Sequence, residues 1–363
     1  MDTVLSSFFP LLLSGHDTIE AAYSLAPSKN CALDYELLAA EKEALRLSKV
    51  RRPKAIRLGS EEFLLAGHGT ASGYPFLIEN EVFSIQFGEF NKPNFFVTYR
   101  SFALWQYGAA KLHRRFLDWA ESLGLVPYQS ESLSRVDLTF DYRVDVIDFD
   151  EDSFVTMAAK DNQHRKNRKV QTFRFGEGGL VLRVYNKVDE IEEKSAKTWF
   201  FDLWGVSENV WRIEWQVRKE WLRRFGIRTF ADLEERQGDL LRFLANDHTT
   251  LRLKTEDSNR SRWPMHPLWQ GLQEQVNQMP GLGIIRELDP EALLNAREIR
   301  LAVSVYGYAK RLAAVRGIKL NTSEIGFEET LKYLCRKLEN VHDPLTWEHD
   351  VERRYNEMRL GQW

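Results

Sequence analysis

Hydrophobic and polar residues alternate through the segment from Ala55 to Tyr99. Four short runs, EEFLLAG, YPFLIEN, VFSIQFG and NFFVTYR, are separated by glycine, asparagine and proline. Alternation with a period of two is typical of half-buried strands, and the separating residues are typical of turns. The pattern therefore predicts an antiparallel meander.

A helical spacing of apolar residues follows the meander. In SFALWQYGAAKLHRRFLDWAESLG the apolar residues recur at helical intervals, and the segment ends at Gly124, a suitable helix C-cap. We expect one long amphipathic helix here. A second helical pattern, TFADLEERQGDLLRFLAND, closes this half of the chain.

Three further strand-like runs lie between these two helices, namely SLSRVDLTFDYRV, VQTFRFGEGGLVLRVYNK and NVWRIEWQVRKEW. The middle run is expected to fold as a hairpin at Gly176–Gly179. From about Thr255 a polar, proline-containing connection leads into segments that are helical by period and caps. We predict an α+β fold, with an antiparallel β-sheet core flanked by helices and a C-terminal helical region. The expected limits are an N-terminal helical arm over 1–50, an α+β domain over 51–255 and the helical region over 256–363.

The N-terminal segment VLSSFFPLLL is apolar but lacks a preceding positive region and is too short to span a bilayer. We interpret it as a packed helix or arm. No run of about 18 apolar residues occurs elsewhere, so no association with a membrane is expected.

Composition narrows the class of protein. A chain of 363 residues with 43% hydrophobic and 12% aromatic residues can bury a core, and its length suggests about two domains. The net charge of −3 excludes a globally basic nucleic-acid binder but leaves room for a local basic groove. The 2 cysteines lie far apart without metal-ligand spacing, which disfavours a disulfide framework and fits a reducing cytoplasm.

Each of the three central strands divides into an apolar and a charged face. The apolar rows are Val136, Leu138 and Phe140; Leu180, Leu182 and Val184; and Trp211, Ile213, Trp215 and Val217. The opposite rows are Arg135, Asp137, Thr139 and Asp141; Arg183, Tyr185 and Lys187; and Arg212, Glu214, Gln216 and Arg218. For any one strand this is ordinary alternation with charges facing water. Taken together, the acids, arginines, tyrosine and lysine also suit a divalent metal, a phosphate and a nucleophile.

Tyr185 would be the nucleophile of such a face. A phenol with a pKa near ~10 is a poor nucleophile at neutral pH, so it needs an adjacent base or a metal that polarises the phosphate. The carboxylates of Asp137 and Glu214 could hold Mg²⁺ or Mn²⁺, while Arg183 and Lys187 neutralise phosphate charge. Asp141 is a further candidate ligand, but ~13 Å of strand separates it from Asp137, so both cannot ligate one ion directly. We favour Asp137 over Asp141.

These strands carry the motifs SRVDLTFDY, LRVYNKVDE and WRIEWQVRK. In this order they resemble R-x-D-x-x-x-D, R-x-Y-x-K-x-x-E and R-x-E-x-Q of the trans-acting replication initiators of rolling-circle plasmids and filamentous phages. The resemblance spans roughly residues 50 to 315 and includes RWPMHPLWQ. The first fifty and last fifty residues match nothing in that family.

The resemblance implies an enzyme that binds origin DNA, nicks one strand, stays attached through a 5′-phosphotyrosine and later rejoins the strand. It implies Tyr185 as the nucleophile with Arg183 and Lys187 beside it, Glu190 at the end of the motif, and Asp137 and Glu214 as metal ligands. The α+β domain would then be the nicking domain, acting on duplex DNA with a single-stranded nick site. A host helicase and a homodimer are further expectations of the resemblance.

A basic run, KDNQHRKNRKVQTFR, precedes the Tyr185 hairpin and contains Arg165, Lys166, Arg168, Lys169 and Arg174. Such a run is commonly a solvated loop, but beside a phosphodiester site it would bind DNA phosphates in a salt-dependent way. Three strand arginines, Arg135, Arg212 and Arg218, are further DNA-binding candidates. Trp263 is either a base-stacking residue or a packing anchor.

Other chemical signals are weaker. Tyr306 and Tyr308, near Lys310, are rival nucleophiles, although their apolar helical context favours core packing. None of the 8 histidines forms the His-hydrophobic-His pair of another class of nicking enzyme. No Walker motif is present, so ATP hydrolysis would have to come from a partner.

Two other functions remain compatible with the sequence. One is a non-catalytic regulator that keeps the basic groove and only binds an origin or operator. The other is a structural protein of a mobile element, which predicts no salt-dependent DNA binding. A covalent adduct between protein and a DNA 5′ end distinguishes nicking from both.

Overall fold

The computed structural model describes residues 9–48, 53–166, 169–280 and 290–359. Contacts divide the chain into two compact units, Met1–Ile285 and Arg286–Trp363. The first unit contains the β-sheet and the second is helical. Within the described residues, no helix is both long and apolar enough to cross a bilayer.

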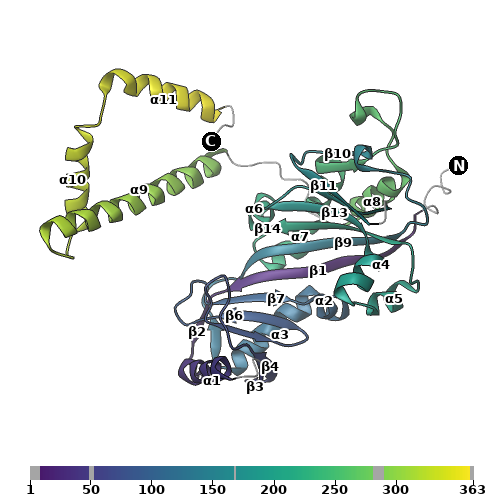
Figure 1. Ribbon diagram of the computed structural model, residues 1–363, viewed down its shortest axis with the longest axis horizontal. Helices are drawn as coiled ribbons and strands as arrows, with labels where there is room; N and C mark the ends of the chain where they lie inside the picture. The colour runs from purple at the N-terminus through teal and green to yellow at the C-terminus, as the bar shows by residue number, and fades with distance from the viewer. Residues whose placement is uncertain (1–8, 49–52, 167–168, 281–289, 360–363) are drawn as a thin grey trace. The chain divides into compact units, whose positions relative to one another are not determined.

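A single antiparallel sheet of 11 strands forms the centre of the first unit (Figure 1). Its order is β11-β12-β13-β14-β9-β1-β7-β6-β5-β4-β3. In chain order the strands are β1 (Leu11–Tyr23), β3 (Lys54–Leu58), β4 (Glu61–Leu65), β5 (Phe76–Glu79), β6 (Phe83–Phe87), β7 (Phe95–Tyr99), β9 (Ser132–Arg143), β11 (Asp161–Lys166), β12 (Lys169–Phe175), β13 (Leu180–Asn186) and β14 (Val210–Arg218). Two small sheets pair β2 (Leu25–Pro27) with β8 (Leu125–Pro127), and β10 (Phe154–Thr156) with β15 (Thr249–Leu251).

Helices flank this sheet. The first unit contains α1 (Tyr35–Leu47), α2 (Ser101–Tyr107), α3 (Ala109–Ser122), α4 (Lys187–Glu190), α5 (Trp199–Trp204), α6 (Lys219–Arg224), α7 (Phe230–Phe243) and α8 (Pro267–Asn277). Short 3₁₀ turns occur at Glu151–Ser153 and Arg260–Arg262, and π-type turns at η3 (Ile191–Ser195) and η4 (Leu244–His248). The second unit contains α9 (Pro290–Leu320), α10 (Phe327–Leu338) and α11 (Pro344–Arg359). The predicted α+β class, with an antiparallel sheet core and C-terminal helices, is confirmed.

The N-terminal segment was expected to be a helix or arm; residues 1–8 lie outside the described residues, and from Leu11 to Tyr23 the expectation was wrong. Residues Leu11–Tyr23 form β1, which pairs with β7 on one side and β9 on the other. The strand buries alternate residues, Ile19, Ala21 and Tyr23, in the core. Helix within this N-terminal region occurs only later in the described residues, in α1. The backbone of β1 is hydrogen-bonded to a strand on each side, and its alternate residues point into the core.

The long helix predicted after the meander is divided into two. Gly108 has φ of 80° and separates α2 from α3. A positive φ is readily adopted only by glycine, so the chain turns at this residue and α3 starts in a new direction. The meander β3–β7 and the hairpin between β12 and β13 have the predicted antiparallel pairing.

The apolar rows of the central strands face one large core. Phe140 and Trp215 lie on this face, and Trp215 packs edge-on against Trp269 of α8 at 5.9 Å between ring centroids. Because α8 packs here, the first unit extends beyond the predicted limit at 255 to Ile285. The opposite face is partly covered by a smaller cluster from α4, η3 and α5, which includes Phe200 and Trp204.

Folding makes the protein sensitive to acid through His16. The half-buried ring lies beneath α7, where its Nε2 is 3.1 Å from Gln237 Oε1, and burial lowers the pKa of His16 to about 4. As the pH falls, the unfolded chain takes up a proton on this ring near pH 6.5, whereas the folded chain takes it up only near pH 4. The contribution of His16 to the free energy of unfolding is therefore fully present above pH 6.5 and is lost as the pH falls toward 4. In His16→Gln, urea unfolding at several pH values should show a loss over this range that is smaller by about 3 kcal/mol. The exposed His68→Gln is the control, and an equal loss in wild type and His16→Gln would contradict the prediction.

Candidate active site

The pairing of β13, β14 and β9 places several of the predicted site residues in adjacent rows across the strands, on one face of the sheet. Tyr185 of β13 lies opposite Arg212 of β14, which lies opposite Asp141 of β9. In the next row, Arg183 lies opposite Glu214. Directly paired residues in a sheet project to the same side, so the charged faces predicted for three separate strands form one continuous surface.

Tyr185 and Glu214 are in direct contact. The phenol Oη of Tyr185 donates a hydrogen bond to Glu214 Oε2 at 2.7 Å, and Arg183 forms an ion pair with Glu214 Oε1. The Tyr185 side chain is only 9% exposed. Burial, followed by the negative charge of Glu214, raises the pKa of Tyr185 well above its usual value. The phenol is therefore protonated at neutral pH, with its proton directed at a carboxylate that can accept it.

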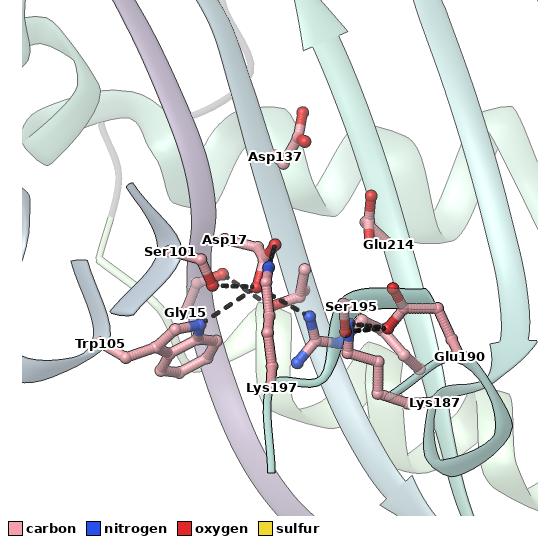
Figure 2. A network of polar contacts seen from close by, with 12 residues as sticks. Gly15, Asp17, Ser101, Trp105, Asp137, Lys187, Glu190, Ser195, Lys197 and Glu214 are labelled. Carbon is pink, nitrogen blue, oxygen red and sulfur yellow. Dashed lines mark hydrogen bonds and ion pairs between the residues drawn. The ribbon is translucent and has the colours of Figure 1, made fainter. Parts of the chain in front are cut away.

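Asp137 is the second buried carboxylate of this face. Its two oxygens accept hydrogen bonds from Arg135 Nε at 2.8 Å and Arg135 Nη2 at 2.5 Å. Burial raises the pKa of Asp137 to about 6, with the negative charge of Glu214 adding to the effect and Arg135 opposing it. Figure 2 shows Asp137 and Glu214 on neighbouring strands. The two carboxylates are thus close enough to repel each other.

Lys187 and Glu190 form a separate ion pair beside Tyr185. Lys187 is 2% exposed, pairs with Glu190 Oε2, and places its Nζ 5.7 Å from the centroid of the Tyr185 ring. Burial and the nearby charge of Arg212 lower the pKa of Lys187. Ser195 Oγ also donates to Glu190 Oε2, at 3.2 Å. All four residues implied by the tyrosine motif therefore lie within one small region.

Arg212 was predicted to bind DNA, and the structure corrects this. Its side chain is fully buried, with Nε and Nη2 donating to the two oxygens of Asp141 at 2.6 and 2.8 Å. Its Nη1 donates to Asp17 at 2.9 Å. A guanidinium with no exposed surface and with these carboxylate partners cannot reach a DNA phosphate. Arg212 instead ties three strands together.

Asp141 has the same structural role. Besides Arg212, it accepts a hydrogen bond from Trp204 Nε1 at 2.9 Å and has no exposed surface. Its partner Arg212 is itself fully buried, whereas Asp137 and Glu214 pair with Arg135 and Arg183, which are partly exposed. In the part of the chain that the structure describes, no group of three or more His, Cys, Asp and Glu side chains is arranged to hold a metal ion.

The remaining predicted DNA-binding residues differ in position. Arg174 is exposed and lies opposite Arg183, so it extends the row of Glu214 toward the sheet edge. Arg135 is half-buried, and Arg165 and Arg218 are exposed. Lys166 and Lys169 pair at the end of the β11–β12 hairpin, but their side chains and the whole of Arg168 lie outside the described residues.

Two aromatic alternatives can also be placed. Trp263 is 8% exposed and donates from Nε1 to the Asp257 carbonyl at 2.6 Å, as expected of a packing anchor. Tyr306 and Tyr308 lie on α9 and are 48% and 67% exposed, so their expected core packing was wrong.

Sequence reasoning missed Asp17. This residue occupies an irregularity in β1, where the register with β9 shifts between His16 and Thr18. Its signal in the sequence is one acid ahead of the alternating run TIEAAY, which no catalytic motif contains. Ser101, Trp105 and Lys197, which contact it, also lie outside the motifs.

Comparisons with known proteins give a likeness to a solved structure. No protein-family model and no curated protein matches the sequence. A solved structure of a rolling-circle replication initiator protein from Geobacillus stearothermophilus is similar, with a TM-score of 0.44 and 15% sequence identity. The match covers 76% of this chain and 99% of that chain.

The Asp141–Arg212 pair should contribute strongly to stability. In Asp141→Asn, Arg212 keeps its buried charge with one charged partner fewer, so the free energy of unfolding should fall by about 3 kcal/mol. The matched control is Asp145→Asn, because Asp145 pairs with Arg143 at the surface with 62% and 43% of their side chains exposed. There the loss should be below about 1 kcal/mol. Equal losses in urea unfolding would show that burial does not set the strength of the pair.

Proposed function

We propose that the protein is a DNA nicking and closing enzyme that uses Tyr185 as its nucleophile on origin DNA. The observation that carries the proposal is the 2.7 Å hydrogen bond from the Tyr185 phenol to the Glu214 carboxylate, with Arg183 paired to the same carboxylate. A nucleophile next to a base, with a cation beside it, is the minimum arrangement for transfer of a phosphoryl group. The order of the three sequence motifs supports DNA as the substrate.

The proposed step exchanges one phosphodiester for another. Tyr185 Oη attacks the phosphorus, Glu214 accepts the phenol proton, and the bond to the 3′ oxygen breaks as that oxygen takes up a proton. The products are a DNA 3′-hydroxyl and a 5′-phosphotyrosine. Because the number of phosphodiester bonds is unchanged, rejoining is the reverse reaction and needs no ATP. This agrees with a sequence that lacks a Walker motif.

Asp137 and Glu214 are the residues that would hold Mg²⁺ or Mn²⁺. Their mutual repulsion contributes to the raised pKa of Asp137, and a divalent cation between two such carboxylates would relieve that repulsion. Magnesium sites commonly use only one or two carboxylates together with substrate phosphates, so a third acidic ligand is not required. When bound, the ion would polarise the scissile phosphate.

Arg183 has one guanidinium nitrogen without a hydrogen-bond partner among the described residues. This nitrogen, Nε, is buried. An unsatisfied buried donor costs about 1–3 kcal/mol. A small movement of this side chain, which is 33% exposed as a whole, would let Nε donate to a phosphate oxygen and make a hydrogen bond that the protein alone leaves unmade. Arg174, exposed in the same row, would contact the phosphate of a neighbouring nucleotide. A helicase partner and a homodimer rest on the sequence resemblance alone.

Replacing Tyr185 by phenylalanine tests the nucleophile directly. Wild-type protein with supercoiled origin DNA and Mg²⁺ or Mn²⁺ should give nicked circles and a protein joined to a DNA 5′ end. In Tyr185→Phe the missing oxygen removes the attacking atom, so the adduct, measured on denaturing gels with end-labelled DNA, should disappear. Chelation of the metal should also prevent it.

Two controls separate Tyr185 from other tyrosines. Tyr142→Phe removes the hydroxyl of another buried tyrosine, on β9, that has no hydrogen-bond partner among the described residues, and should leave the adduct unchanged. A Tyr306→Phe/Tyr308→Phe double variant removes the rival nucleophiles. Adduct in Tyr185→Phe, or DNA binding by wild type without any adduct, would overturn the proposal, and the second result would identify a non-catalytic regulator.

Arg174 should contribute to phosphate binding but take no part in the reaction itself. Arg174→Ala should weaken binding to single-stranded DNA and lower the slope of log K against log salt by about 0.7, because one phosphate contact is lost. Fluorescence anisotropy at several salt concentrations measures both. Arg57→Ala is the control, since Arg57 is equally a surface arginine but lies on β3, at the other edge of the sheet. An unchanged slope in Arg174→Ala would exclude it from the DNA path.

A further inference from the structure

Asp17 receives hydrogen bonds from four different side chains. Ser101 Oγ donates at 2.8 Å, Trp105 Nε1 at 3.3 Å and Lys197 Nζ at 3.1 Å (Figure 2). Arg212 Nη1 donates at 2.9 Å. These donors come from α2, from β14 and from the turn before α5, while Asp17 itself lies on β1. One carboxylate therefore joins the sheet to two of the segments that cover its polar face.

The charge of Asp17 is firmly held. Burial alone would raise the pKa of Asp17, but the cations Arg212, Lys197 and Lys187 outweigh burial and keep it well below its usual value. A carboxylate that stays ionised with 8% exposure is stable only while its partners remain in place. Loss of any partner is costly, so the network resists displacement of the segments it joins.

A chain of contacts leads from Asp17 to Tyr185. Arg212, held by Asp17, lies directly opposite Tyr185 in the sheet and stacks at 4.5 Å on the ring of Phe200. Lys187 Nζ lies 5.4 Å from the Phe200 ring and 5.7 Å from the Tyr185 ring. Phe200 thus contacts two cations, one fixed by Asp17 and one beside the tyrosine. Lys197, the other charged partner of Asp17, precedes the helix that carries Phe200.

The contacts of Asp17 lie on one particular face of the sheet. The main core and α8 lie on the opposite face of the sheet, and the network lies on the face of Tyr185 and Glu214. Glycine at position 15 supports the arrangement, because a Cβ there would lie 2.7 Å from the Trp105 ring. The indole that donates to Asp17 can pack on β1 only because that side chain is absent.

We propose that Asp17 is a positioning residue for Tyr185, acting through Arg212 and through Lys197 to fix the α4–η3–α5 segment beside the tyrosine. The inference rests on the proposed function, since it assigns Asp17 a role in the Tyr185 reaction. Asp17 does not touch the phosphate. It holds the groups that set where the phenol and Lys187 lie.

The test compares two buried aspartates on opposite faces of the sheet. Asp17→Asn removes the charge while keeping the shape, and Asp239→Asn does the same for a 4% exposed carboxylate on α7 that pairs with Arg242. Both variants should lose stability. The rate constant for adduct formation, in a single turnover on single-stranded origin DNA well below the melting temperature, should fall about tenfold or more only in Asp17→Asn, because small misplacements of a reacting group are costly.

The amplitude of adduct formation separates positioning from stability. A purely stabilising role would lower the fraction of active molecules, and hence the amplitude, and leave the rate constant unchanged. Full amplitude with a slower rate in Asp17→Asn, and a wild-type rate in Asp239→Asn, is the expected result. A rate within twofold of wild type in Asp17→Asn would overturn the inference.

A second variant and a measurement without DNA complete the test. If Asp17→Asn does not fold, Lys197→Met takes its place, because it removes the link to α5 and leaves the Asp17–Arg212 pair; an unchanged rate there would overturn the inference. Amide hydrogen exchange over residues 187–204 should be faster in the variant without DNA. Unchanged exchange overturns the positioning role even if Tyr185 is the nucleophile. Absence of an adduct with wild type overturns the proposed function itself.

Discussion

The buried guanidinium of Arg212 is the constraint on which the polar face depends. Moving such a charge out of water is expensive, and the cost is offset only by close, well-directed carboxylates. Asp141 of β9 and Asp17 of β1 supply them at 2.6 to 2.9 Å. Strands β14, β9 and β1 therefore hold a fixed register around one cation. Because Tyr185 and Glu214 are placed by that same register, the geometry of the candidate site follows from an ion pair that performs no chemistry.

Charge on this face is divided between two kinds of pair. The pairs around Arg212 are buried and mutually saturated, which suits a structural role. Arg183 and Arg135 instead pair with Glu214 and Asp137 while remaining partly exposed, and Arg183 keeps one donor unsatisfied. A ligand can form a hydrogen bond with a polar group that has no partner within the protein. The difference between the two kinds of pair is burial, not residue type.

Much of the sheet could be predicted because period-two alternation reports directly on strand faces. The apolar rows of β9, β13 and β14 enter the core as expected, and Tyr185 meets Glu214 because their strands pair. The sequence could not distinguish Arg212 from Arg183, since both sit on charged faces and only tertiary packing decides which is covered. Helix was also predicted where β1 lies. The pairing of β1 with β9 is irregular, so the apolar residues of this stretch do not alternate regularly in the sequence. Asp17 was missed for a different reason, because its partners come from segments far away in the chain.

The span of the Arg212–Asp17 contact has a consequence for synthesis. These residues are separated by 195 positions, with β1 made first and β14 among the last strands of the sheet. While the chain is being made, β1 can pair with β7, but its acid at position 17 has no Arg212 until β14 has emerged. Contacts over such long sequence separations form late, because loop closure must come before they contribute. A nascent chain or fragment that stops short of β14 thus has neither the buried cation nor Glu214, so the candidate site forms only once the sheet is complete.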